Sequence, residues 1–353
     1  MKHLHICLIA LGLIVVGCSS SGDGEKNVSA IDVIVSDFVG TTPGGADVLR
    51  ERNGTTDRSS AGIGSSAGEA LVSGRPFRVG SISKPFVAVM VLQLVDENVV
   101  SLDATLANYL PNTLVGGAIT IRQLLSHKSG IANYTDQPAF FQDAFANPER
   151  LLTPDEILSY VLDVPAGEVG RFSYSNTNYI LLGQLIEQLD SLDLNASLQA
   201  RISGPLELYN TVFDGTSNVT LPDGLAGGWS SSFGYDGDAS DPYSAIASGA
   251  WAAGSLISTT DDLATFIKAL VAGQLVSSDS FAQMSDTGES DYGLGLQLFE
   301  LPSGQVFYGH GGSIPGYLSG MAIDPTDSTT LVILTNNDDL NVQTLTLRVM
   351  AAE

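Results

Sequence analysis

Apolar residues near the start of the chain's globular part follow first a helical and then a strand-like spacing. The apolar residues between Ile31 and Val39 fall on one helical face, and Gly40 ends the run. Two short strand-like stretches follow and meet at Asn53-Gly54, a dipeptide typical of tight hairpins. These patterns predict a helix followed by a β-hairpin.

Later stretches predict helices in the middle of the chain and strands near its end. Residues 81–97 are apolar enough for a buried helix that Ser81 opens. From 101 to 244 the signals are mostly helical, with capping boxes that begin at Thr120 and Thr153. A capped helix is then predicted near Thr259 to Val271, and strand patterns return at residues 293–298, 320–324 and 329–335.

Strands at both ends around a helical middle predict a discontinuous arrangement. We expect one α/β domain assembled from residues 29–100 and 245–353, with residues 101–244 inserted as a mostly helical domain.

The N-terminus predicts export. A short basic start precedes an apolar run from Ile6 to Val16, too short for a bilayer span of about 20 residues but typical of a signal peptide. The end of this run at Cys18 resembles the bacterial lipoprotein signal. The resemblance implies a signal peptide over residues 1–17, a lipidated Cys18, a flexible tether over 18–28 and a lipid anchor in the periplasmic side of the cell envelope. The alternative is an ordinary signal peptide with an incidental Cys.

Composition excludes several classes of protein. The chain has 353 residues, is 44% hydrophobic and carries a formal net charge of -24, which excludes intrinsic disorder and argues against nucleic-acid binding and electrostatic membrane docking. Only His127 and His310 lie outside the signal peptide, which argues against a His-rich zinc site. The acidic stretch 236–241 lacks the Gly and terminal Glu of a calcium loop, so we predict a solvated loop there, and no metal or cofactor.

A possible nucleophile lies at the start of the helix predicted at 81–97. Ser81 and Lys84 are one helical turn apart on the same face, so the amine can approach the hydroxyl. A partly desolvated Lys has a lowered pKa and can activate such a Ser. The pair alone is weak evidence, because a Ser that opens a helix is usually a cap.

Two later motifs strengthen this interpretation. Tyr174-Ser175-Asn176 and His310-Gly311-Gly312-Ser313 follow Ser81-Ile82-Ser83-Lys84 in an order that resembles the serine β-lactamase and penicillin-binding protein superfamily, specifically its class C β-lactamase-like branch. The likeness covers roughly residues 29–350 and is greatest toward serine-type D-alanyl-D-alanine carboxypeptidases. It extends to the segments Phe77–Gly80, Leu124–Gly130, Pro165–Gly167, Tyr292–Leu296 and Pro315–Tyr317. The resemblance implies an α/β (α+β) fold with an antiparallel sheet flanked by helices and an inserted helical domain.

The resemblance also implies roles for the reacting groups. Ser81 would be the acylated nucleophile, Lys84 would help remove its proton, and Tyr174 would act as second base and as acid toward the leaving group. The backbone N–H groups of Ser81 and Ser313 would form the oxyanion hole, worth about 3 kcal/mol per donor in comparable enzymes.

The remaining motif residues would bind substrate. Asn176 would hold Lys84 and the substrate amide, and His310 would replace the usual basic residue of the third motif in an electrostatic and positional role. Gly311 and Gly312 would let the strand backbone approach the ligand. His127 is expected to brace a turn rather than touch substrate.

The expected function is hydrolysis through an acyl-enzyme, most directly as a D-alanyl-D-alanine carboxypeptidase acting on cell-wall peptides. The alternatives are a β-lactamase, a carboxylesterase, or a catalytically silent lipoprotein that binds cell-wall peptide or a protein partner. Between Arg201 and Arg348 the only basic residue is Lys268, and Gln297 is uncharged. Few cations are therefore predicted near a substrate carboxylate, which weakens the carboxypeptidase assignment.

A second serine motif competes with this interpretation. Residues 64–68 match the G-x-S-x-G pattern of a nucleophile elbow. An elbow needs a buried strand before it and a helix after it, whereas polar residues precede this segment and Pro76 soon follows. We therefore predict a loop at residues 64–68.

Overall fold

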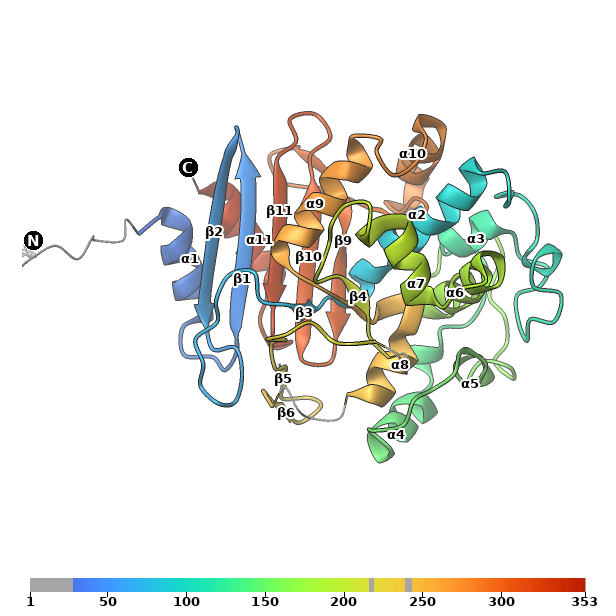
Figure 1. The fold of residues 1–353 in the computed structure, drawn as a ribbon, viewed down its shortest axis with the longest axis horizontal. Helices are drawn as coiled ribbons and strands as arrows, with labels where there is room; N and C mark the ends of the chain where they lie inside the picture. Colours follow the sequence, from blue (N-terminus) through green and yellow to red (C-terminus); the bar gives the residue numbers. More distant parts are fainter. Residues whose placement is uncertain (1–27, 216–218, 239–242, 353) are drawn as a thin grey trace, which may run out of the picture.

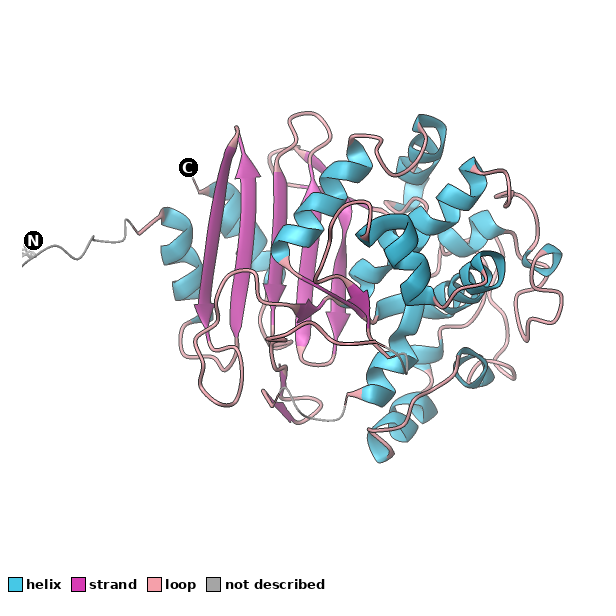
Figure 2. Cartoon of the chain, viewed as in Figure 1, coloured by secondary structure: helices cyan, strands magenta, loops and turns pink. Residues whose placement is uncertain are grey.

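The computed structural model describes residues 28–215, 219–238 and 243–352. One antiparallel sheet forms the centre of the fold, with helices on both faces and a largely helical body beside it (Figures 1 and 2). This arrangement confirms the predicted fold class. The strand order is β2-β1-β11-β10-β9-β8, with β1 at Gly45–Arg52, β2 at Thr55–Gly62, β8 at Gln297–Glu300, β9 at Val306–Ile314, β10 at Tyr317–Ile323 and β11 at Thr330–Thr335.

The helices cover the sheet and build the body next to it. They are α1 (Ala30–Val39), α2 (Ser83–Asp96), α3 (Ile121–Leu125), α4 (Pro138–Ala146), α5 (Pro154–Ser159), α6 (Asn176–Asp190), α7 (Leu194–Leu198), α8 (Ser244–Gly254), α9 (Thr260–Val271), α10 (Ser278–Ser285) and α11 (Val342–Ala351). Helices α1 and α11 pack together against one face of the sheet, and α9 lies over β10 and β11 on the other (Figure 1). Helices α2, α6 and α8 pack against one another in the helical body.

Short strands complete the fold. A three-stranded sheet joins β3 (Phe77–Arg78), β7 (Leu256–Ser258) and β4 (Val212–Phe213), and a two-stranded sheet joins β5 (Trp229–Ser230) and β6 (Tyr235–Asp236).

The N-terminal hairpin pairs with the last strand of the chain. Asn53 and Gly54 both have positive φ, 53° and 75°, as a two-residue hairpin turn requires, so this prediction and that of α1 are confirmed. Strand β1 then pairs antiparallel with β11, which brings both ends of the chain into one sheet.

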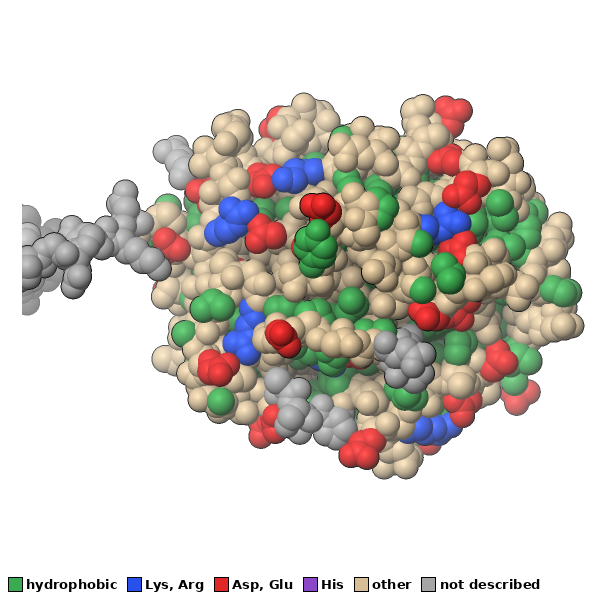
Figure 3. All heavy atoms as spheres, viewed as in Figure 1, with side chains coloured by type: hydrophobic (Ala, Val, Ile, Leu, Met, Phe, Trp, Pro, Cys, Tyr) green, Lys and Arg blue, Asp and Glu red, His purple; other side chains and the backbone are tan. Residues whose placement is uncertain are grey.

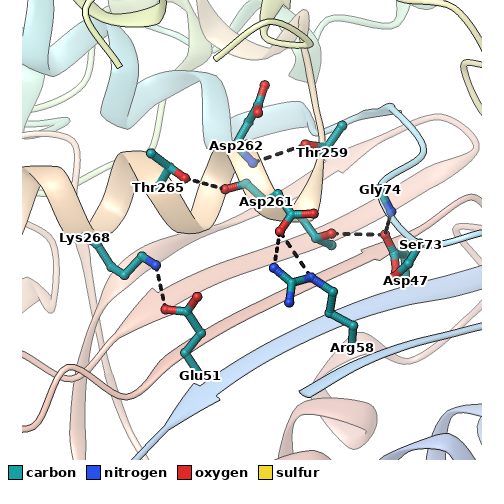
Figure 4. Close-up of polar contacts among 11 residues, drawn as sticks. Asp47, Glu51, Arg58, Ser73, Gly74, Thr259, Asp261, Asp262, Thr265 and Lys268 are labelled. Carbon is teal, nitrogen blue, oxygen red and sulfur yellow. Dashed lines mark hydrogen bonds and ion pairs between the residues drawn. The ribbon is translucent and has the colours of Figure 1, made fainter. Parts of the chain in front are cut away.

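Ion pairs fasten α9 to this hairpin (Figure 4). Lys268 lies 2.6 Å from Glu51 of β1, and Arg58 of β2 lies 2.5 Å from Asp261. Lys268 is the only basic residue between Arg201 and Arg348, and its charge is used here rather than in a substrate site. On the face shown in Figure 3, basic side chains likewise lie directly beside acidic ones.

Two local predictions differ from the structure. The helix expected from Ser81 begins at Ser83, because residues 80–82 form a tighter 3₁₀ turn. The strand expected over 293–298 begins at Gln297, since Gly293 closes a turn by donating its N–H to the Leu296 carbonyl. Helices α10 and α11 have weaker patterns and were not predicted, and strand β9 was expected only at Gly311 and Gly312, through the third motif.

Some of the predicted segments lie wholly or partly outside the described residues. Cys18, the signal peptide and the tether up to residue 27 lie outside the described residues, as does part of the acidic stretch 236–241. No helix in the described ranges has the length and apolar character needed to cross a membrane. Residues 64–68 form a loop without a following helix, as predicted.

Candidate active site

Ser81 lies where a 3₁₀ turn meets strand β9. Gly80 adopts a φ of +53°, and a Cβ there would lie 2.7 Å from the backbone N of Ser313. Only glycine permits this close approach. The neighbouring Ser83 fixes the turn, since its hydroxyl donates to the Gly80 carbonyl at 2.8 Å and accepts from the N–H of Leu256 at 2.9 Å.

Lys84 is fully buried beneath Ser81 and has three polar neighbours. Its Nζ lies 3.0 Å from Oγ of Ser81, 2.8 Å from Oδ1 of Asn176 and 2.7 Å from the carbonyl of Ala253. Burial away from water holds the pKa of Lys84 well below its usual range, because desolvation penalises the ammonium. The amine is therefore available in its neutral form.

Asn176 is fixed by two residues of a neighbouring loop. Its backbone N–H donates to the Asn133 side chain at 3.0 Å, and its Nδ2 donates to the Thr135 hydroxyl at 3.1 Å. With Nδ2 engaged in this way, Oδ1 faces Lys84.

Tyr174 faces the same hydroxyl from the other side. Burial raises the pKa of the Tyr174 phenol above its usual value, and a hydrogen bond with the Ser81 side chain partly opposes this rise. The Nζ of Lys84 lies 4.9 Å from the centre of the Tyr174 ring. The two groups most able to exchange protons with Ser81 thus flank it.

A chain of three buried side chains supports Tyr174 and the third motif. Nδ1 of His127 accepts from the backbone N–H of Ser175 at 3.1 Å, which leaves the proton of the neutral ring on Nε2, 3.2 Å from the Tyr292 hydroxyl. That hydroxyl lies 3.1 Å from Nε2 of His310. His127 therefore braces the turn beside Tyr174 and links it to His310.

His310 is held neutral in one tautomer. Its Nδ1 lies 2.5 Å from the Gly311 carbonyl, which only accepts, so Nδ1 carries the proton and Nε2 accepts from Tyr292. Burial, with a smaller contribution from the charge of Lys84, lowers the pKa of His310 to about 3. His310 is therefore uncharged at neutral pH and presents no positive charge to a substrate.

The two glycines of the third motif differ in their surroundings. A Cβ on Gly312 would collide with the Val79 carbonyl and the Ser319 hydroxyl, so this glycine lets β9 pack against the segment before Ser81. A Cβ on Gly311 would meet only ordinary contacts, the nearest at 3.8 Å. The absence of a side chain at Gly312 is therefore needed for packing inside the protein, and the expectation that both glycines let a ligand approach stays a prediction.

Two cavities meet at Ser81 and Ser313. The Tyr174 cavity, about 620 Å³, is lined by Tyr174, His310 and Gln297 among others. The phenylalanine cavity, about 230 Å³, is lined by Asn176 and by apolar side chains that include Phe140, Phe141 and Phe233. Among the described residues that line either cavity there is no Lys or Arg, whereas Asp338 lines the second and Asp339 the first.

The sequence did not point to several of these groups. Tyr292 belongs to a segment that resembles the family, but nothing in its spacing shows that it joins two histidines. The carbonyl of Ala253, the phenylalanines and Asp338 come from distant segments, and only the folded chain brings them together. In the described part of the chain, no three His, Cys, Asp or Glu side chains are grouped as metal ligands would be.

Comparisons with known proteins agree with this site. The profile of the family described as Beta-lactamase matches residues 34–351. The chain is 27% identical over 304 residues to penicillin-binding protein 4 of Amycolatopsis lactamdurans, an alignment that covers 76% of this chain and 74% of that protein. It spans only 62% and 61% of the length of two longer relatives from Bacillus subtilis.

Two solved structures share the fold over most of the chain. A D-stereospecific amidohydrolase from Streptomyces sp. has a TM-score of 0.80 and 28% identity, and the alignment covers 90% of this chain and 96% of that one. A D-amino acid amidase from Ochrobactrum anthropi SV3 has a TM-score of 0.79 and 25% identity, over 91% and 96% of the two chains. The chain therefore belongs to the Beta-lactamase family and is a serine hydrolase of the β-lactamase and penicillin-binding protein superfamily.

Proposed function

We propose that this serine hydrolase cleaves amides of amino acids or short peptides whose acyl group carries a free amino group, with preference for the D configuration. The observation that carries the proposal is the charge beside Ser81: acidic side chains and no Lys or Arg among the described residues that line the two cavities. An ammonium group suits such a site, whereas a terminal carboxylate needs a cation to hold it.

Lys84 is the base in this proposal. A neutral amine has two N–H groups and one lone pair. The side-chain carbonyl oxygen of Asn176 and the backbone carbonyl oxygen of Ala253 accept hydrogen bonds from these two N–H groups. The lone pair is then free to accept the proton of Ser81. Oγ of Ser81 then attacks the substrate carbonyl carbon, while the backbone N–H groups of Ser81 and Ser313 stabilise the negative oxygen.

Tyr174 is the acid. Because burial raises the pKa of its phenol, Tyr174 retains its proton at neutral pH and can give it to the leaving nitrogen as the carbon–nitrogen bond breaks. In the second half of the reaction water attacks the ester, its proton returns to Tyr174, and the ammonium of Lys84 returns a proton to Oγ of Ser81. The products are an amine and a carboxylic acid, and both side chains recover their starting states.

The similar solved structures support the amide substrate and the D configuration, since they are a D-stereospecific amidohydrolase and a D-amino acid amidase. The D-alanyl-D-alanine carboxypeptidase function stays a prediction that the charge of the cavities disfavours. β-Lactamase and esterase activity are outcomes of the test below.

The test compares substrates on the full-length protein in detergent, with Ser81→Ala as the blank. Release of ammonia from D-alanine amide and D-phenylalanine amide is expected to exceed hydrolysis of the N-acetylated amides and of an N-acylated D-alanyl-D-alanine. Asp338→Asn is expected to reduce the preference for the free amine about tenfold, as the loss of one charge-assisted contact would. Faster cleavage of the acylated D-alanyl-D-alanine would overturn the proposal, as would turnover of penicillin or p-nitrophenyl acetate alone.

We propose in addition that Cys18 is lipidated and anchors the chain in the periplasmic side of the cell envelope, on the sequence pattern alone. Cys18→Ala is expected to move the protein from the membrane fraction to the soluble periplasmic fraction. Equal membrane retention of both forms would contradict the anchor.

A further inference from the structure

We propose that the phenylalanine cavity is the subsite for the acyl residue and that it selects a single aromatic side chain there. This inference rests on the proposed function and adds to it the side chain that the substrate presents.

The two cavities can be assigned to the two halves of the substrate. Both include Ser81 and Ser313, so both open on the point where the carbonyl is attacked. The leaving nitrogen must lie next to its proton donor, and Tyr174 lines only the larger cavity. The acyl half must therefore extend to the other side of Ser81, into the cavity lined by Asn176 and the phenylalanines.

The walls of the phenylalanine cavity are aromatic. Phe140 packs edge-on against Phe141 with ring centres 4.9 Å apart, and Phe141 stacks on Phe233 at 5.9 Å with an angle of 24° between the planes. Phe233 is 38% exposed although it lies on a turn anchored by the hydroxyl of Ser230. An exposed ring held in place at the rim of a cavity gains most by covering an apolar ligand.

The size of the cavity limits the acyl group. Its volume of about 230 Å³ is below the range of about 300–1,000 Å³ that drug-sized ligands occupy, so it suits one residue rather than a peptide. Its apolar wall continues through Ile246, Ala250 and Ile314, while Asp338 supplies a carboxylate on the same lining. An amino acid with an apolar ring and a free amine matches both parts.

Asp338 is fixed on this lining. Its Oδ2 accepts from the backbone N–H of Gly316 at 2.8 Å, and its own N–H donates to the carbonyl of Trp229 at 3.1 Å. The carboxylate therefore stands at the edge of the aromatic cavity and does not need to reorganise to meet an ammonium group.

The first experiment varies one half of the substrate at a time on the full-length protein. With a constant p-nitroanilide leaving group, kcat/KM is expected to be about 10- to 100-fold higher for a D-phenylalanyl than for a D-alanyl substrate, the gain from burying a phenyl ring. With a constant D-alanyl group, enlarging the amine from ammonia to phenylethylamine is expected to change kcat/KM less than fivefold. The reverse pattern would overturn the assignment of the cavities.

A pair of matched variants tests the wall itself. Phe141 lines the cavity, whereas Phe145 is one turn further along α4, stacks on Phe141 and Phe233 at 6.0 and 5.3 Å, and does not line it. Phe141→Ala is expected to reduce the phenylalanyl-to-alanyl ratio of kcat/KM about tenfold. Phe145→Ala is expected to leave that ratio within twofold.

The outcomes separate the two proposals. Hydrolysis of both amino acid anilides with no preference, or a ratio that Phe141→Ala leaves unchanged, would overturn the aromatic subsite and leave the proposed function standing. Absence of Ser81-dependent hydrolysis for every amino acid amide would overturn the proposed function itself.

Discussion

The hydroxyl of Tyr292 lies 3.1 Å from Nε2 of His310, and the backbone fixes the direction of the hydrogen bond between them. The Gly311 carbonyl can only accept, so Nδ1 of His310 carries the ring proton and donates to it. Nε2 then has no proton, and Tyr292 must donate to it. The same hydroxyl accepts from Nε2 of His127, so one phenol bridges two histidines whose tautomers the backbone fixes.

Tyr292→Phe is expected to lower the free energy of unfolding by about 1–3 kcal/mol, because a buried acceptor on His310 and a buried donor on His127 lose their partner. Urea unfolding of the variant and the wild type measures this. Tyr209→Phe is the control, since Tyr209 is 80% exposed and its loss should change stability by less than about 0.5 kcal/mol. Equal stabilities of the Tyr292 variant and the wild type would contradict the role of this hydroxyl as hydrogen-bond partner of both histidines.

Stability is expected to fall in mild acid through His310. Its pKa is lowered to about 3 in the folded chain from an ordinary value of 6.5, so the unfolded chain binds more protons between these values. The stabilising contribution is complete above pH 6.5 and is lost as the pH falls toward 3. The loss from this one group between pH 7.5 and pH 5 is about 2 kcal/mol.

Comparison with His310→Gln isolates this effect. The difference in unfolding free energy between wild type and variant should shrink as the pH falls from 7.5 to 5, measured by urea unfolding at each pH. A difference that stays constant over this range would mean that His310 does not titrate as its burial implies.

Lys84→Arg is expected to reduce kcat/KM by about 10²- to 10⁴-fold, the usual contribution of a general base. Arginine keeps a positive charge at all accessible pH values and cannot accept the proton of Ser81. In the wild type, the rising limb of the pH profile should lie well below pH 10.5, because burial lowers the pKa of Lys84. Circular dichroism checks that the variant is folded, and a folded variant with more than a tenth of wild-type activity would exclude Lys84 as the base.

The sequence predicts the parts of this fold whose signals are local. The hairpin at Asn53-Gly54 and the capped helices that follow Thr120, Thr153 and Thr259 depend on neighbouring residues, and all four are present. Strand β9 carries glycines at 309, 311 and 312, which weaken a strand pattern although the sheet partners and Val79 require two of them.

For the site, the motifs indicate Ser81, Lys84 and Tyr174, and the structure places these three side chains next to one another. The motifs carry this information because the family that they resemble brings its fold with it. The substrate charge and shape that we propose depend on Asp338 and Phe233, which stand on loops distant in sequence from Ser81, Lys84 and Tyr174. Such loops have no periodic pattern, so their contribution emerges only from the three-dimensional structure.

Gly80→Ala is expected to disable the site by moving Ser81 away from β9. Alanine would have to adopt the φ of +53° that Gly80 has, which costs about 1–2 kcal/mol for a non-glycine residue. Its Cβ would also collide with the backbone of Ser313. Because a shift of about 1 Å in a reacting group costs on the order of 100-fold in rate, kcat/KM should fall at least that far.

Gly74→Ala is the matched control: its φ of +80° imposes a similar backbone cost, yet its Cβ would meet nothing closer than an Asp261 oxygen at 3.9 Å. Measured side by side in urea, both variants should lose at least the backbone cost in stability, with a larger loss for Gly80→Ala, while only Gly80→Ala loses activity. Equal activities would mean that the contact between Gly80 and Ser313 does not position the nucleophile.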